Sequence, residues 1–175
     1  MQQWAAANGE AALAALCARF AEQARTGASR TLTGPTGESN VYTLVAREAV
    51  LCLADDDRDR LVQLAAVFAA GSQAVWPAPA RPLRDRLPQA LRERIVLAHD
   101  WAAPTVAFDA VLLHGSEAAL RETGMALAQR PGPIIGVQRL APGATDVALE
   151  RLVVERALSV NTAAAGGNAS LMTIG

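Results

Sequence analysis

The chain contains no lysine. All 16 of its basic residues are arginine, so no ammonium side chain is available to form a Schiff base or to clamp a phosphate. Its 17 acidic residues leave a net charge of −1, and no basic cluster forms along the sequence. This balance gives no electrostatic basis for binding nucleic acid or an anionic membrane surface.

Long apolar runs are absent as well. A helix needs about 20 consecutive apolar residues to cross a bilayer, and no stretch approaches that length. The N-terminal residues Met1-Gln-Gln-Trp4 lack the basic region and the apolar region that follow one another in a secretory signal. We therefore expect a cytoplasmic protein with no transmembrane segment.

Cysteine and histidine are scarce, with two of each. Cys17 lies on the apolar side of a predicted helix and Cys52 in a predicted strand, so both are expected to be small buried hydrophobic residues. His99 and His114 have no further His or Cys at ligand spacing. The carboxylates of Asp55–Asp57 directly precede a predicted helix, where Asp is a common N-cap. The sequence therefore predicts no metal site.

The chain is rich in small apolar residues whose spacing changes along the sequence. Apolar residues make up 51%, including 39 alanines, and aromatic residues only 4%. A chain of 175 residues is long enough for one domain with its own core. The apolar period switches between about 3.6 and 2. It predicts helices at 9–25, 57–70 and 117–129, a short helix from residue 82, and strands at 41–46, 49–54, 74–76, 95–98, 108–113 and 134–137.

This alternation of strands and helices predicts an α/β fold built on a Rossmann-like doubly wound parallel sheet. We expect four segments along the chain. They are an N-terminal amphipathic helix with its connection at 1–33, the Rossmann-like domain at 34–140, a protruding β-arm at 141–161 and a C-terminal tail motif at 162–175.

The last third of the chain has the pattern of an interaction segment. Apolar and polar residues alternate over 152–160, which predicts a long strand. We expect this strand to be unpaired within the chain, and therefore to cause homodimerisation or strand exchange in isolation. From Ser159 onward there is no charge and little side-chain bulk, so the tail is expected to lie in a groove on a partner. The residues expected to make these contacts are Leu152, Val154, Leu158, Val160, Asn161, Gly166, Gly167, Asn168, Leu171, Met172 and Ile174.

A doubly wound sheet binds ligands in the crevice at the carboxyl ends of its strands. The sequence places Asp55–Asp56, Trp76–Pro77 and His114–Ser116 there. The Gly115-Ser116 turn opens a helix, where backbone amides can hold an anion. We favour a capped turn without a ligand, because the sequence has no Gly-x-Gly-x-x-Gly or Walker motif. His114 is either an acid or base in this crevice or, as we favour, a hydrogen-bonded structural residue.

Two stretches resemble the aldehyde dehydrogenase superfamily. The stretch 64–79 is similar to its nucleotide-binding helix and strand, and 111–116 to the turn that carries the cofactor's pyrophosphate. Trp76 and Pro79 stand where the family has the Lys and Glu that hold the adenosine ribose, and neither can make those hydrogen bonds. The family's catalytic Cys and Glu have no counterpart. The resemblance implies a vestigial crevice, with no catalytic residue and no cofactor bound by this chain.

The ending is similar to a narrower family. Residues 149–175 resemble the C-terminus of the bifunctional proline utilisation (PutA) family, and four shorter stretches fit the same region: 34–38, 50–53, 108–111 and 132–135. That family couples an FAD-dependent proline dehydrogenase to an NAD-dependent glutamate semialdehyde dehydrogenase through an internal tunnel. The resemblance implies a non-catalytic C-terminal domain whose partner is the catalytic aldehyde dehydrogenase module of the same polypeptide, with FAD and NAD bound elsewhere in it.

Three classes of function remain open. The first is a structural and interaction domain that supports the aldehyde dehydrogenase module and closes the substrate channel. The second is a nucleotide-binding module that retains anion recognition at Gly115-Ser116. The third is a free-standing enzyme that uses His114 or Asp55.

Overall fold

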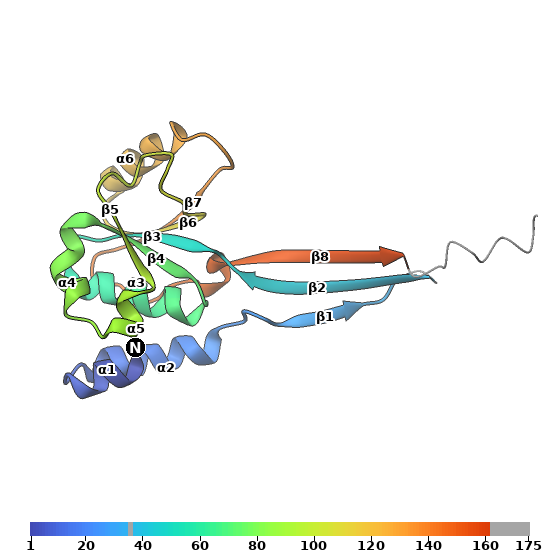
Figure 1. The fold of residues 1–175 in the computed structure, drawn as a ribbon, viewed down its shortest axis with the longest axis horizontal. Helices are drawn as coiled ribbons and strands as arrows, with labels where there is room; N and C mark the ends of the chain where they lie inside the picture. The colour runs from blue at the N-terminus through green and yellow to red at the C-terminus, as the bar shows by residue number, and fades with distance from the viewer. Residues whose placement is uncertain (35–36, 162–175) are drawn as a thin grey trace, which may run out of the picture.

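The computed structural model describes residues 1–34 and 37–161, which form a compact body and a long projecting arm (Figure 1). The body contains a five-stranded parallel sheet in the order β5-β4-β3-β6-β7. Its strands are β3 (Ala49–Leu53), β4 (Gln73–Pro77), β5 (Ile95–Ala98), β6 (Ala110–His114) and β7 (Gly136–Leu140). The arm is a three-stranded antiparallel sheet in the order β1-β2-β8. Its strands are β1 (Ser29–Leu32), β2 (Glu38–Ala46) and β8 (Val153–Asn161).

The order of the parallel strands is that of a doubly wound sheet. From β3 the chain moves outward through β4 to β5, then returns to the other side of β3 and continues through β6 to β7. The direction of winding therefore reverses between β3 and β6, and the carboxyl ends of these two strands border the switch point. The predicted Rossmann-like α/β fold is confirmed.

Helices cover the two faces of the parallel sheet unequally. One face packs on α1 (Gln2–Ala7), α2 (Ala11–Gln23) and α3 (Asp57–Ala69) in a large core that includes Phe20, Leu64 and Trp76. The other face has a smaller core around Leu51 and Val111, next to α6 (Glu117–Ala128). The short helices α4 (Arg81–Asp85) and α5 (Gln89–Arg92) lie between β4 and β5 along the chain.

Local sequence signals set the helix ends. The Asp56 carboxylate caps α3 by accepting hydrogen bonds from the backbone nitrogens of Arg58 at 2.7 Å and Asp59 at 3.3 Å. The helix is followed by Gly71 at φ +88°, a conformation that suits glycine after a helix. The helix predicted at 9–25 is α2, and a further short helix, α1, precedes it; Gly9 at φ +77° lies between the two. Among the described residues, no helix is both long and apolar enough to cross a membrane.

The arm differs from the expectation for 141–161. Strand β8 is not unpaired: it pairs with β2 over nine residues, from Glu38 opposite Asn161 to Ala46 opposite Val153. The range 34–140, expected to form the Rossmann-like domain, thus includes a strand of the other sheet. Alternation of apolar and polar residues shows that a segment is a strand, but it does not show which other strand pairs with it. Here the two paired strands lie more than 100 residues apart in the sequence.

Arg47 joins the arm to the body. It follows β2 directly, and β3 begins two residues later. Its Nε donates to the backbone oxygen of Arg151 at 2.9 Å, and its Nη1 donates to that of Asp109 at 3.0 Å. Its backbone nitrogen also donates to the Leu152 oxygen at 3.2 Å. One side chain therefore holds the start of β6 next to both strands that enter the arm.

The two cysteines are free and buried, as predicted. Burial raises the pKa of the Cys52 thiol from 9.0 to about 12, with smaller opposing effects from Trp76 and Arg60. Above pH 9 the unfolded chain therefore loses this proton while the folded chain keeps it. The stability that the neutral thiol contributes is complete below pH 9 and declines as the pH rises.

We expect the free energy of unfolding to fall between pH 8 and pH 10, with on the order of 1 kcal/mol of the loss due to Cys52. Urea unfolding at both pH values measures it. Cys52→Ala should reduce the fall by about that amount, whereas Cys17→Ala, whose thiol pKa burial raises less, should reduce it less. An unchanged pH dependence in Cys52→Ala would contradict the prediction.

Candidate functional site

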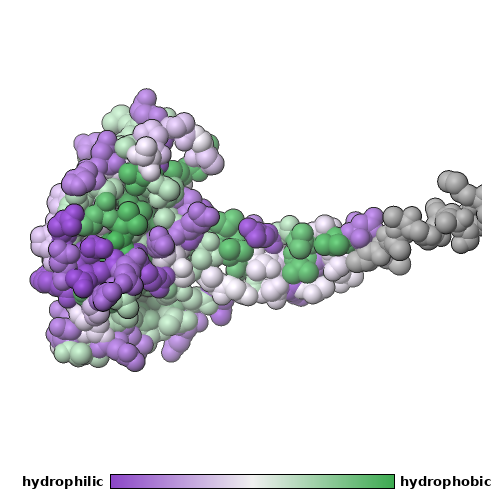
Figure 2. Space-filling model, in the orientation of Figure 1, coloured by the Kyte–Doolittle hydropathy of each residue, from purple (hydrophilic) through white to green (hydrophobic). Residues whose placement is uncertain are grey.

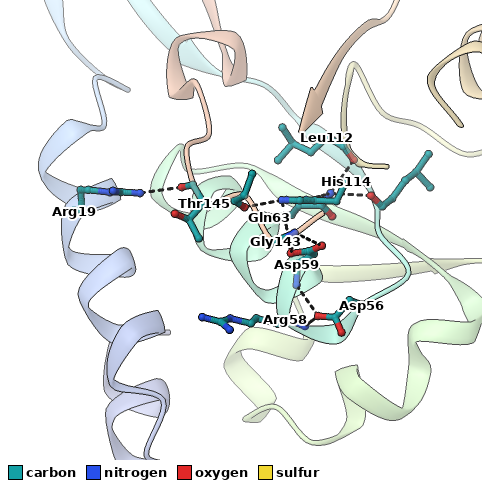
Figure 3. Close-up of polar contacts among 11 residues, drawn as sticks. Arg19, Asp56, Arg58, Asp59, Gln63, Leu112, His114, Gly143 and Thr145 are labelled. Carbon is teal, nitrogen blue, oxygen red and sulfur yellow. Dashed lines mark hydrogen bonds and ion pairs between the residues drawn. The ribbon is translucent and has the colours of Figure 1, made fainter. Parts of the chain in front are cut away.

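The candidate site is the crevice at the carboxyl ends of β3 and β6. The fold brings the expected residues Asp55–Asp56 and His114–Ser116 to this edge of the sheet. It also brings a segment that sequence analysis did not place there, the connection 141–147 between β7 and the arm. Figure 3 shows this connection next to the ends of α2 and α3 and the side chain of His114. Because the connection 141–147 lies at the strand ends, a ligand could enter the crevice only if this segment moved away.

His114 is a buried structural residue. It ends β6 and is 4% exposed. Its Nε2 lies 2.8 Å from the backbone oxygen of Ala144, which can only accept, so Nε2 carries the hydrogen. Its Nδ1 lies 3.0 Å from Gln63 Nε2 and accepts from it. Both ring nitrogens of a neutral imidazole are thus occupied by the protein, which leaves neither free for acid or base chemistry.

Gln63 ties the two strands of the switch point together. This α3 residue is fully buried. Its amide nitrogen lies 2.8 Å from the Leu53 oxygen at the end of β3, 3.1 Å from the Leu112 oxygen in β6 and 3.0 Å from His114 Nδ1, so three acceptors share its two hydrogens. The Gln63 side chain therefore lies between the ends of β3 and β6, and its amide group donates toward the backbone of the sheet.

Asp59 holds the connection from the first turn of α3. The residue is 5% exposed, and both of its carboxylate oxygens lie 3.0 Å from the backbone nitrogen of Gly143. One of them lies 4.0 Å from His114 Nε2. Arg19 of α2 donates from Nη2 to the Thr145 oxygen at 2.9 Å (Figure 3). Residues 143, 144 and 145 are each held through a backbone atom by a side chain from a different element.

The Gly115-Ser116 turn serves the protein's own backbone. The Gly115 nitrogen donates to the Leu140 oxygen at 3.0 Å, and Ser116 Oγ accepts from the Ala119 nitrogen at 3.2 Å as the predicted helix cap. Glu117 follows in the first turn of α6 and pairs with Arg139 at 2.8 Å. A carboxylate at this helix N-terminus occupies the electrostatic position that a bound anion would take.

Trp76 and Pro79 do not line this crevice. Trp76 is fully buried in the large core, and β3 separates its strand from β6. Pro79 is exposed on the 3₁₀ turn Ala78–Ala80. The residues expected to line one vestigial crevice therefore lie in three places: Trp76 in the core, Pro79 on the surface, and His114–Ser116 at the end of β6. In the described part of the chain, no group of three or more His, Cys, Asp or Glu side chains is placed to hold a metal ion.

The residues expected to bind a partner lie in different environments. Leu152 is 1% exposed and belongs to the core, because it lies in the 3₁₀ turn Leu149–Leu152 before β8. Val154, Leu158 and Val160 are 41%, 58% and 45% exposed along the arm, and Asn161 is exposed at its end. Figure 2 shows hydrophobic residues along the arm between polar ones. Gly166, Gly167, Asn168, Leu171, Met172 and Ile174 lie outside the described residues.

Comparison with solved structures defines the class of fold. PutA from Bradyrhizobium japonicum, in a point-mutant form, matches with a TM-score of 0.55 and 22% identity, over 74% of this chain and 15% of that one. A substrate-bound AldH of Staphylococcus aureus matches with a TM-score of 0.53 and 17% identity, over 74% of this chain and 31% of that one. The chain thus has the Rossmann-like fold of the aldehyde dehydrogenases. No protein-family model matches it.

Sequence comparison is more specific. The chain is 53% identical over 177 aligned residues to the bifunctional protein PutA of Escherichia coli K12, which covers 100% of this chain and 13% of that protein. PutA of Rhizobium meliloti is 39% identical over 153 residues, covering 82% of this chain and 12% of that protein. The chain is therefore related over its whole length to one segment of PutA, as its ending predicted. It spans about an eighth of the length of these relatives.

We expect Asp59→Ala to destabilise the chain by about 1–3 kcal/mol, because it leaves the Gly143 amide without its buried acceptor. Asp55→Ala is the matched control: Asp55 is exposed, and its loss should cost no more than about 0.5 kcal/mol. Urea unfolding measures both, and amide exchange at Gly143 should become faster in Asp59→Ala alone. Equal stability of the two variants would contradict the role given to Asp59.

Proposed function

We propose that this chain is the non-catalytic C-terminal domain of a bifunctional proline catabolism enzyme. That polypeptide oxidises proline with FAD in one module and glutamate semialdehyde with NAD in another. The domain supports the aldehyde dehydrogenase module, which is its partner in the same polypeptide, and closes the channel through which the intermediate passes. We place the protein in the cytoplasm.

The observation that carries the proposal is the arm. It extends away from the body as a narrow sheet (Figure 1) and exposes Val154, Leu158 and Val160 to solvent. Exposed apolar residues grouped on a projecting sheet favour contact with another protein surface. Because the matched PutA proteins are about eight times longer than this chain, the remainder of such a polypeptide can supply that surface.

The crevice supports a role without cofactor chemistry. The connection 141–147 is held across the carboxyl ends of β3 and β6, and His114 has a protein partner at each ring nitrogen. The nucleotide-binding alternative requires the Gly115-Ser116 amides to meet a phosphate close to the Glu117 carboxylate. Glu117 already pairs with Arg139 at 2.8 Å, so an anion at this turn would compete with an internal carboxylate for the same positive charge.

We expect no saturable binding of NAD to the isolated chain in calorimetric titration up to millimolar nucleotide. A catalytic aldehyde dehydrogenase titrated under the same conditions is the positive control. Binding with a micromolar dissociation constant would favour the nucleotide-binding module instead, and its loss in Gly115→Ala would locate it. A Cβ on Gly115 would lie 3.2 Å from the Ala119 Cβ and 3.3 Å from Leu113 Cδ1. The added methyl group would therefore crowd the turn in which the Gly115-Ser116 amides would have to meet a phosphate.

Deletion of residues 159–175 from the full-length bifunctional enzyme should impair aldehyde oxidation and release the intermediate into solution, while proline oxidation is largely preserved. The physical reason is that the tail and the end of the arm then no longer cover the dehydrogenase module. Separate assays of the two activities and a trapping assay for free intermediate measure the effect. Equal loss of both activities would indicate general misfolding, and no loss of either would refute the proposal.

In the absence of the rest of the polypeptide, we expect the chain to form homodimers through the arm. Strand β8 lies at the edge of its sheet in the described structure, and an open edge can pair with a second chain.

A further inference from the structure

The strand register assigns the arm's side chains to two faces. Residues directly opposite each other in an antiparallel ladder point to the same face, and successive residues alternate. Val41 lies opposite Leu158, and Val45 lies opposite Val154. With Val160 these residues form one face, here called the apolar face: Val41, Val45, Val154, Leu158 and Val160. The opposite face carries most of the polar residues, Glu38, Asn40, Tyr42, Glu155, Ser159 and Asn161, together with Leu44, Ala46, Val153 and Ala157. Leu32 of β1, which is 43% exposed, also lies on this face.

The polar groups of the opposite face satisfy one another. Ser159 donates its hydroxyl hydrogen to Asn40 Oδ1, and Asn40 Nδ2 donates to Glu38 Oε2 at 3.3 Å. A hydrogen bond to Glu155 raises the pKa of the Tyr42 hydroxyl, with smaller effects from burial and from the charge of Glu155. This face therefore has internal partners for its polar groups and is suited to remain in water.

The apolar face contains one charge, Arg156, which lies between Val154 and Leu158 on the same side of β8. Arg156 is exposed, and within residues 1–34 and 37–161 its guanidinium makes no hydrogen bond or ion pair. It lies opposite Thr43, whose Oγ1 is 3.2 Å from Ser29 Oγ. A guanidinium without a charged partner, flanked along its strand by Val154 and Leu158, fits a partner surface that supplies a carboxylate within an apolar patch.

We propose that the arm docks through its apolar face, and that the surface it meets is an apolar patch of the aldehyde dehydrogenase module containing a carboxylate opposite Arg156. This inference rests on the proposed function and specifies the contact. A second copy of the chain fits the same face poorly. In the described part of the arm, this face of a second copy carries no Asp or Glu to pair with Arg156, so self-packing would bury the guanidinium without a carboxylate.

Thiol footprinting at adjacent positions tests which face is covered. Leu158→Cys places a thiol on the apolar face, and Ala157→Cys, the matched control, places one on the opposite face of the same strand. Both positions are exposed in the isolated chain, and the native Cys17 and Cys52 are buried. Labelling by a maleimide is followed by mass spectrometry of the peptide, in the isolated chain and in the full-length enzyme.

We expect similar labelling rates at 157 and 158 in the isolated chain. In the full-length enzyme, labelling at 158 should be at least about tenfold slower than at 157, because docking buries one face only. Equal protection of both positions, protection of 157 alone, or protection of neither would overturn the face assignment. Protection of 158 in the isolated chain that rises with concentration would overturn the choice of partner in favour of a second copy.

The role of Arg156 is tested on the same footprint. Arg156→Glu in the full-length Leu158→Cys background should restore labelling at 158 at least about tenfold, because a carboxylate would then face a carboxylate. Arg30→Glu, on the opposite face and also exposed, should leave it unchanged. An unchanged rate in Arg156→Glu would overturn the predicted carboxylate.

Failure of this inference is distinguishable from failure of the proposed function. If deletion of 159–175 impairs aldehyde oxidation but neither thiol is protected, the domain supports the dehydrogenase through another surface. If the deletion changes neither activity and both thiols remain reactive in the full-length enzyme, the proposed function itself fails.

Discussion

The structure depends on how the connection 141–147 is held to the switch point of the sheet. Asp59, His114 and Arg19 bind three successive residues of it through backbone atoms, from α3, β6 and α2. Because these contacts are made to the backbone, they constrain the path of the connection rather than its side chains. The path has two consequences: it covers the crevice where a doubly wound sheet would bind a ligand, and it delivers the chain to the start of β8.

A second set of contacts, made by Arg47, holds the base of the arm. Arg47 contacts the backbone oxygens of Arg151 and Asp109, so the ends of β2 and β8 and the start of β6 are fixed together. Beyond this point β2 and β8 support each other through a nine-residue ladder, with β1 along the far edge of β2. On one face of the arm Tyr42, Asn40 and Ser159 have partners within the arm, and on the other Ser29 contacts Thr43 at 3.2 Å.

Much of the body could be predicted from sequence, because its signals are local. The Asp56 and Ser116 caps, Gly71 and the change of apolar period locate α3, α6 and the parallel strands within a few residues. The pairing of β2 with β8 could not be predicted, since a half-apolar strand carries no label for a partner a hundred residues away. Leu152 was expected on the arm's surface because it continues the alternation of β8, but the turn before β8 directs it into the core.

The closed crevice was only partly predictable. Sequence reasoning favoured a structural role for His114, yet it found neither Asp59 nor Gln63, which complete the network. Asp59 reads as an ordinary acidic residue in the first turn of a helix. Gln63 carried a usable signal, because a polar side chain between Val62 and Leu64, among the most buried positions of α3, needs buried partners. The connection itself gave no signal, since its contacts are made by the backbone.

These two features place a Rossmann-like sheet at the origin of a projecting arm. A doubly wound sheet binds ligands at its strand ends, and here the side chains of Asp59, His114 and Arg19 hold the segment that leads to the arm across those ends. The same contacts that hold this segment across the strand ends therefore give the arm a fixed origin on the parallel sheet. Asp59 lies in the body and not on the apolar face of the arm. Asp59→Ala should therefore change the stability of the domain while leaving the apolar residues of the contact surface in place.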